Sequence, residues 1–82
     1  MRVTVRLFAR VRDIVGAAEV VREVPEGATL HDVWQDLIAE YPALEPYTAS
    51  VSAARNLEYA PMKAPLADGD EVAFLPPVSG GQ

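Results

Sequence analysis

The chain has 82 residues, half of them hydrophobic, which predicts one small folded domain rather than two domains or a disordered protein. It contains no cysteine, which excludes a disulfide framework, a thiolate nucleophile and a cysteine metal site. The formal charge of −5 argues against a nucleic acid partner. No apolar run approaches the roughly 18 residues of a membrane span. We therefore expect a cytoplasmic protein that binds neither nucleic acid nor membrane.

Two strands and a helical turn are predicted at the start of the chain. In residues 2–9, Val3, Val5 and Leu7 alternate with polar residues, which is the period of a half-buried strand. Residues 10–15 predict a short helical turn that Gly16 closes. The valine-rich segment 18–24 predicts the second strand, and a turn follows it at residues 25–27.

The clearest predicted element is a helix that starts after Thr29 and ends before Pro42. Thr29 is a favourable N-cap residue, and Asp32 three positions later approximates a capping box. Apolar residues then recur at helical spacing along one face, which we expect to pack on a sheet. These residues are Leu30, Val33, Trp34, Leu37, Ile38 and Tyr41.

Shorter strands are expected in the second half of the chain. After a connection over residues 43–48, residues 50–54 predict a weak strand, and residues 56–59 predict a turn that enters another short strand. Asp68-Gly69 is a strong turn dipeptide, and residues 71–75 predict the last strand. This order of elements predicts an α+β fold over residues 1–75, in which the helix covers one face of the sheet.

Strand parity predicts an apolar patch on the face of the sheet that the helix leaves uncovered. Val72 and Phe74 share a face with the inward residues of the first strand, so Leu75 points the other way, as Phe8 does. Tyr59 is a further candidate for this face. A contiguous patch would indicate a protein partner, whereas scattered surface hydrophobics would need no explanation.

Residues 76–82 form a C-terminal tail that is expected to be flexible at its tip. Pro76 and Pro77 stiffen its start, whereas Gly80-Gly81 carries no side chain and keeps full backbone freedom. Such a tail either frays at the surface or reaches into a narrow site, and these residues alone leave both interpretations open. The one reactive group that its tip offers is a backbone carboxylate.

The chain shows no constellation of side chains that would make it an enzyme on its own. Its single histidine, His31, is expected on the solvated face of the helix. The acidic residues around Asp68-Gly69 fit turn chemistry better than acid–base catalysis, and there is no phosphate-binding glycine loop. We therefore expect no bound cofactor and no metal.

Two segments of the chain resemble the MoaD/ThiS family of ubiquitin-like sulfur carriers, and the first of them favours the molybdopterin branch over the thiamine branch. They are residues 7–16, LFARVRDIVG, and residues 65–81, PLADGDEVAFLPPVSGG. The resemblance implies a β-grasp fold, with a mixed sheet of four to five strands and one main helix packed across one face.

The resemblance also implies a role in molybdenum cofactor biosynthesis, as the small sulfur-carrier subunit of a two-subunit molybdopterin synthase. A ubiquitin-activating-like adenylyltransferase would use ATP to adenylate Gly81, and a sulfur donor protein would help to convert it to a thiocarboxylate. The tail, with Gly80 permitting threading, would then deliver sulfur to a pterin precursor inside the large synthase subunit, in a 2+2 heterotetramer. The residues that would bind the partners are Phe8, Tyr59, Leu75, Pro76, Pro77 and Val78.

Gln82 departs from the family pattern, because family members usually end at the second glycine. It leaves Gly81 without a free carboxylate, so a C-terminal peptidase would have to remove Gln82 first. Two alternatives share the tail chemistry and stay open. One is a sulfur carrier for thiamine, cysteine or thiolated tRNA, and the other is a ubiquitin-like modifier that is joined to protein lysines.

Overall fold

The computed structural model describes residues 1–77. The elements of the first half are β1 (Arg2–Leu7), α1 (Ala9–Val15), β2 (Glu19–Glu23) and α2 (Leu30–Glu40). Those of the second half are the 3₁₀ helix η1 (Pro42–Tyr47), β3 (Ser52–Arg55), β4 (Glu58–Ala60) and β5 (Glu71–Leu75).

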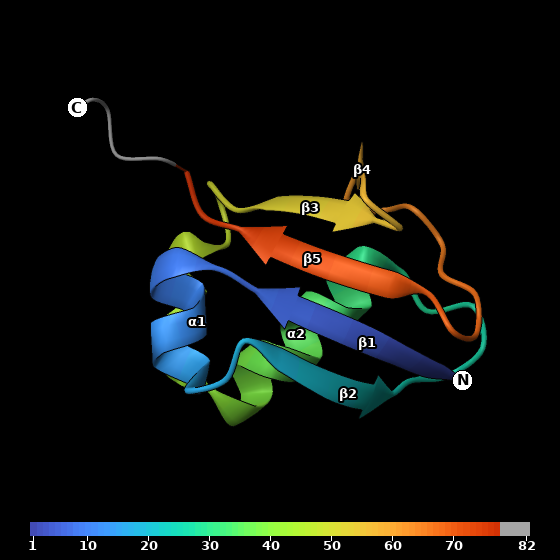
Figure 1. Cartoon of the computed structure of the whole chain (residues 1–82), viewed down its shortest axis with the longest axis horizontal. Helices are drawn as coiled ribbons and strands as arrows, with labels where there is room; N and C mark the ends of the chain where they lie inside the picture. Colours follow the sequence, from blue (N-terminus) through green and yellow to red (C-terminus); the bar gives the residue numbers. More distant parts are fainter. Residues whose placement is uncertain (78–82) are drawn as a thin grey trace.

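The five strands form one mixed sheet in the order β2-β1-β5-β3-β4, and α2 lies across one of its faces (Figure 1). The central strands β1 and β5 are parallel, although they come from opposite ends of the chain, and the other neighbours are antiparallel. The register pairs Leu7 with Phe74. The end of β1 therefore lies beside the end of β5, and residues that follow both strands meet at one edge of the domain.

Helix α2 starts and stops where its sequence predicts. Asp32 donates its backbone N–H to Thr29 Oγ1 at 3.2 Å, and Thr29 donates its backbone N–H to Asp32 Oδ2 at 2.9 Å, so the capping box is complete. The last helical residue is Glu40, and the ring of Pro42 prevents a further turn.

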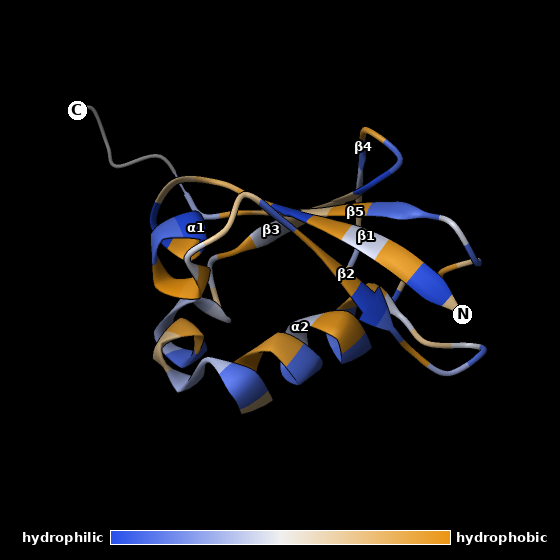
Figure 2. Cartoon of the chain, turned by 60° about the horizontal axis from the view of Figure 1, so that its bottom comes forward, coloured by the Kyte–Doolittle hydropathy of each residue, from blue (hydrophilic) through white to orange (hydrophobic). Residues whose placement is uncertain are grey.

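The apolar face of α2 forms the centre of the core, as Figure 2 shows by its orange side turned toward the sheet. Leu30, Val33, Trp34 and Leu37 are fully buried, whereas Ile38 and Tyr41 at the end of the stripe are partly buried. The opposing sheet residues are equally buried, and they include Val3, Val5, Leu7, Val72 and Phe74. The inward faces predicted for the first and last strands are thus confirmed.

Trp34 is the largest side chain in this core. Its ring centroid lies 5.0 Å from that of Phe74, with the ring planes at 56°, which is a favourable tilted arrangement. The indole Nε1–H donates a hydrogen bond to Thr48 Oγ1 at 3.0 Å. The one polar atom of this buried side chain is therefore satisfied, and the bond ties the segment after η1 to the helix.

The structure corrects three predicted boundaries. Strand β1 ends at Leu7 rather than at residue 9, because the chain turns at Ala9, where φ is +52°, to begin α1. Residues 43–48 are not a plain connection, since most of them belong to η1. The third strand begins at Ser52 rather than at residue 50, because the N–H groups of residues 50 and 51 both bond to the carbonyl of Tyr47.

Candidate functional site

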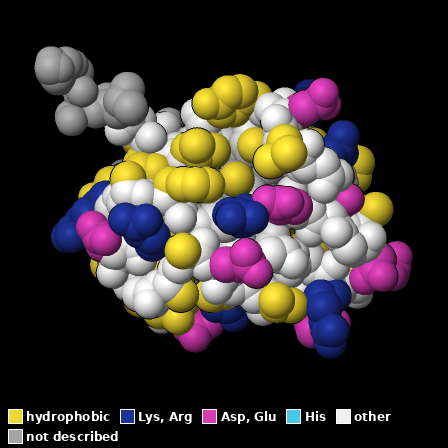
Figure 3. Space-filling model, in the orientation of Figure 1, with side chains coloured by type: hydrophobic (Ala, Val, Ile, Leu, Met, Phe, Trp, Pro, Cys, Tyr) yellow, Lys and Arg dark blue, Asp and Glu magenta, His cyan; other side chains and the backbone are white. Residues whose placement is uncertain are grey.

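The face of the sheet that α2 leaves uncovered is divided into a charged half and an apolar half. Arg2 on β1 pairs with Glu23 on β2 at 2.6 Å, and Arg6 on β1 pairs with Glu71 at the start of β5 at 3.2 Å. Over β5, β3 and β4 the side chains are mainly hydrophobic, and they gather next to the charged group (Figure 3). A half-apolar surface of this kind is typical of a protein-binding site.

The apolar half contains a hollow of about 230 Å³. It is lined by Phe8, Ala54, Leu57, Tyr59, Glu71, Ala73 and Leu75, which we call the docking face. Ala54 and Ala73 are paired across β3 and β5, so two small side chains lie between larger ones and leave room for an incoming group.

The three anchors predicted from the sequence lie together on the docking face. Phe8 is 41% exposed and Tyr59 is 78% exposed, whereas Leu75 is half-buried. Phe8 and Leu75 meet there because β1 and β5 run parallel and side by side. The strand parity that placed both residues opposite the core is thus correct, while their role in binding stays a prediction.

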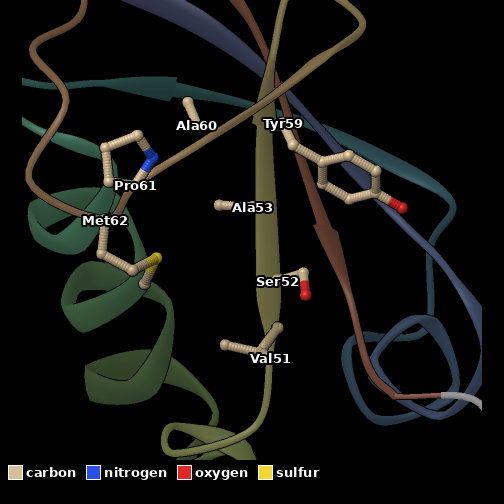
Figure 4. A pocket seen from close by; sticks show the side chains of 7 residues that line it. All are labelled: Val51, Ser52, Ala53, Tyr59, Ala60, Pro61 and Met62. Carbon is tan, nitrogen blue, oxygen red and sulfur yellow. The ribbon is translucent and has the colours of Figure 1, made fainter.

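Tyr59 lines both the docking face and a second groove on the other side of the β3–β4 hairpin. This second groove is wider, about 430 Å³, and is lined mainly by apolar residues such as Val51, Ala53 and Met62. Figure 4 shows the Tyr59 ring directed away from Ala53 and Met62. The two apolar surfaces therefore meet at Tyr59, and Leu75 lines the docking face but not the second groove.

The C-terminal tail starts at the docking face. Leu75 is the last residue of β5 and lines the hollow, and Pro76 and Pro77 follow it directly, half-buried and exposed, respectively. The predictions for Val78, Gly80, Gly81 and Gln82, and for the flexibility of the tail tip, lie outside the described residues. What the described part does show is that the tail begins beside the anchors rather than at the far end of the domain.

Leu57 and Ala54 are members of the docking face that sequence reasoning missed. Leu57 is 87% exposed and forms the β3–β4 turn together with Asn56. The signal available in the sequence was the predicted turn at residues 56–59, since a hairpin turn that contains an apolar residue exposes it. Ala54 carried no such signal, because its place in the hollow depends on the pairing of β3 with β5.

Among residues 1–77 there is no group of three or more histidine, aspartate or glutamate side chains that could hold a metal ion. His31 is exposed at the start of α2, as predicted. Within the same residues, no helix is both long and apolar enough to cross a bilayer.

Asp70 joins the start of β5 to the β3–β4 turn. Its Oδ1 accepts a hydrogen bond from Asn56 Nδ2 at 3.0 Å, and its Oδ2 accepts one from the backbone N–H of Ala67 at 2.8 Å. These two hydrogen bonds hold the pKa of the Asp70 carboxyl below its ordinary value, and the bond from the Asn56 side chain contributes more than the bond from Ala67. The charged form of Asp70 therefore stabilises the fold.

Replacing Asp70 with asparagine should lower the stability at neutral pH, and the difference from the parent chain should shrink in acid. The pKa of the Asp70 carboxyl is lower in the folded than in the unfolded state. The carboxylate therefore makes its full contribution to the free energy of unfolding above the unfolded pKa of about 3.9, and this contribution is lost as the pH falls through the folded-state pKa. Denaturant unfolding of both proteins from about pH 7 to about pH 2 measures this change. A difference that stayed constant over that range would contradict the role assigned to the carboxylate.

The family is decided by comparison with known proteins. The model of the ThiS family matches residues 5–81, which is nearly the whole chain. The chain belongs to the ThiS family. A ThiS-family relative in Chlamydomonas reinhardtii, named molybdopterin synthase sulfur carrier subunit, is 41% identical over 99% of this chain and all of that protein. Small archaeal modifier protein 1 of Haloferax volcanii is 34% identical over 93% of this chain and 97% of that protein.

Solved structures of ThiS-like proteins share the fold. The crystal structure of small archaeal modifier protein 1 from Haloferax volcanii has a TM-score of 0.88 at 32% identity and covers 99% of this chain and all of that one. A chain in the structure of a complex of subunits 1 and 2 of molybdopterin-converting factor from Helicobacter pylori has a TM-score of 0.68 at 26% identity. The match covers 99% of this chain and all of that one. The predicted ubiquitin-like β-grasp fold is confirmed.

Proposed function

We propose that this chain is a sulfur carrier for molybdenum cofactor biosynthesis. In this proposal it acts as the small subunit of molybdopterin synthase, and it is not an enzyme on its own. The observation that best supports the proposal is the continuity of the two functional parts. The family match runs through Gly81, and the tail that carries this residue starts at the rim of the apolar docking face.

The proposed chemistry uses the carboxylate of Gly81. A carboxylate is a poor electrophile, so a ubiquitin-activating-like adenylyltransferase first joins it to AMP from ATP and releases pyrophosphate. A donor protein then supplies sulfur at the sulfide level, which attacks the acyl carbon and expels AMP, so that a C–S bond replaces the bond to AMP and a thiocarboxylate remains. ATP is consumed by this partner, and the carrier itself binds no cofactor in the scheme.

Sulfur delivery requires that the carrier and the large synthase subunit bind each other. In the proposal, the docking face holds the domain against the large subunit, with Phe8, Tyr59 and Leu75 as anchors. Pro76, Pro77 and Val78 lead the tail into the active site, where Gly80 allows it to thread a narrow channel. Two carriers and two large subunits would form a heterotetramer. The Helicobacter pylori relative, solved with a second subunit, supports such a partner.

Truncating Phe8 tests this assignment. Phe8→Ala should weaken binding to the large subunit by about 2 kcal/mol, or about thirtyfold, because apolar anchors at an interface centre often cost this much. The fold should stay intact, because Phe8 lies outside the core. Calorimetric titration with the purified large subunit measures the affinity.

Val21→Ala is the matched control for this titration. Val21 is also an exposed apolar residue and lies on the same side of the sheet as Phe8, but on β2, away from the hollow. We expect its affinity to equal that of the parent chain. Equal losses for both variants would mean that general surface hydrophobicity, and not the docking face, holds the partner.

A second candidate function is protein modification, since a relative that is 34% identical is named small archaeal modifier protein 1. The two functions diverge after adenylation. A carrier accumulates a thiocarboxylate and passes the sulfur on, whereas a modifier forms an amide with a lysine of another protein. Incubation with the activating enzyme, ATP and a cell extract separates them, because only the modifier produces conjugates of higher mass. Abundant conjugates without pterin sulfuration would favour the second function.

A further inference from the structure

The β3–β4 turn holds an apolar residue in a backbone conformation that does not suit it. Arg55 pairs with Glu58, so the loop consists of Asn56 and Leu57 alone. Their φ angles are +51° and +73°, which is the pattern of the hairpin turn that places both loop residues at positive φ. Asparagine tolerates this region and glycine is preferred at the second position, whereas a branched residue such as leucine is strained there.

Leu57 makes no packing contact that would stabilise the domain. The side chain is 87% exposed and does not belong to the hydrophobic core or to the residues packed against it. Strain and exposure both disfavour leucine at this position, and glycine would relieve both. An unfavourable residue that is held in place at a surface hollow points to a role in binding.

The turn is fixed by contacts with β5 before any partner arrives. Asn56 donates its backbone N–H to the carbonyl of Glu71 at 2.7 Å, and its Oδ1 accepts the N–H of Glu71 at 2.9 Å. The amide Nδ2 donates to Asp70 Oδ1 at 3.0 Å, and that carboxylate is itself held by Ala67. Asn56 therefore bonds to two successive residues at the start of β5, and this bonding fixes the direction of Leu57.

We propose that Leu57 is a further anchor of the docking face, which enters an apolar pocket of the large synthase subunit, and that Asn56 is its positioning residue. The inference rests on the proposed function, because the partner is the same. Leu57 lines the same hollow as Phe8, Tyr59 and Leu75, so the partner that covers those residues also meets Leu57. Because the turn is already ordered, it loses little conformational entropy when the partner binds.

Leu57→Gly should have opposite effects on stability and on binding. Glycine removes the strain at φ +73°, so the thermal midpoint should stay unchanged or rise. The same substitution removes the anchor, so the affinity for the large subunit should fall about tenfold, which corresponds to about 1.4 kcal/mol. Thermal unfolding and titration with the purified large subunit measure the two effects, and Val21→Ala is again the control.

A double-mutant cycle tests the positioning role of Asn56. Asn56→Gly keeps positive φ accessible but removes the side-chain bonds to Asp70 and Glu71, so it should weaken binding without touching the partner. If Asn56 acts through Leu57, the combined Asn56→Gly, Leu57→Gly variant should bind no more weakly than Leu57→Gly alone. A merely structural contribution of Asn56 would instead add to the effect of Leu57→Gly.

The outcomes separate this inference from the proposed function. A tenfold loss for Leu57→Gly with a non-additive cycle supports the inference. If Leu57→Gly binds like the parent chain while Phe8→Ala loses affinity, Leu57 is not an anchor and only the inference is wrong. If losses from Asn56→Gly and Leu57→Gly add, the positioning role is wrong. If the parent chain does not bind the large subunit at all, the proposed function is wrong and the inference with it.

Discussion

A form of this chain that ends at Gly81 should gain one sulfur atom from the activating enzyme, ATP and a sulfur donor, whereas the form that carries Gln82 should gain none. With Gln82 present, the carboxyl carbon of Gly81 belongs to a peptide bond, and the nearest free carboxylate lies one residue farther along. That displacement is about 3.3–3.6 Å in an extended chain. A shift of this size in the reacting atoms removes most of the rate of a positioned reaction. Intact-mass analysis detects the exchange of one oxygen for one sulfur.

The side chain of Gln82 is a second obstacle to activation. In the proposed function the glycines thread a narrow channel of the partner, and a glutamine side chain at the reacting position would add bulk there. Prior treatment with a peptidase that removes only Gln82 should restore activation, and this treatment is the control for damage to the domain. A thiocarboxylate on intact Gln82 would contradict the prediction, and would mean that the activating enzyme accepts a terminal residue with a side chain.

Leu37→Ala should lower the free energy of unfolding by about 2–5 kcal/mol. Leu37 is fully buried in the middle of the α2 stripe, so its truncation removes buried apolar atoms and leaves a cavity in the core. Small domains are stable by only about 5–15 kcal/mol, so the loss is a large fraction of the total. Denaturant unfolding measures it.

Gln35→Ala on the same helix is the matched control for Leu37→Ala. Gln35 is exposed, so its truncation should change the stability by less than about 0.5 kcal/mol. A Leu37→Ala variant as stable as this control would mean that α2 does not pack on the sheet as described.

The parts of the fold that the sequence predicts well are those with strong local signals. Thr29 and Asp32 mark the start of α2 because a capping box needs only neighbouring residues. The alternation in residues 71–75 places Phe74 inside and Leu75 outside, because successive side chains of a strand point to opposite faces. The prediction of Phe8 and Leu75 on one uncovered face follows from this parity alone.

Other features depend on contacts that no local pattern records. The hollow exists because Ala54 pairs with Ala73 across two strands, and a sequence does not show the register of such a pair. The bond between Asn56 and Asp70 joins residues fourteen positions apart, so the rigidity of the β3–β4 turn is equally hidden. The 3₁₀ helix η1 has no clear periodicity, since prolines at residues 42 and 46 interrupt the pattern of a regular helix.

The most direct test of the central claim is a single-turnover sulfur transfer. The chain ending at Gly81 is first converted to its thiocarboxylate, and is then mixed with the purified large synthase subunit and the pterin precursor. We predict that the carrier returns to its carboxylate form while the pterin gains sulfur. Intact mass follows the change in the carrier. The change should occur only when both the large subunit and the precursor are present. A thiocarboxylate that persists in the complete mixture, while the pterin stays free of sulfur, would contradict the assignment to molybdopterin synthesis.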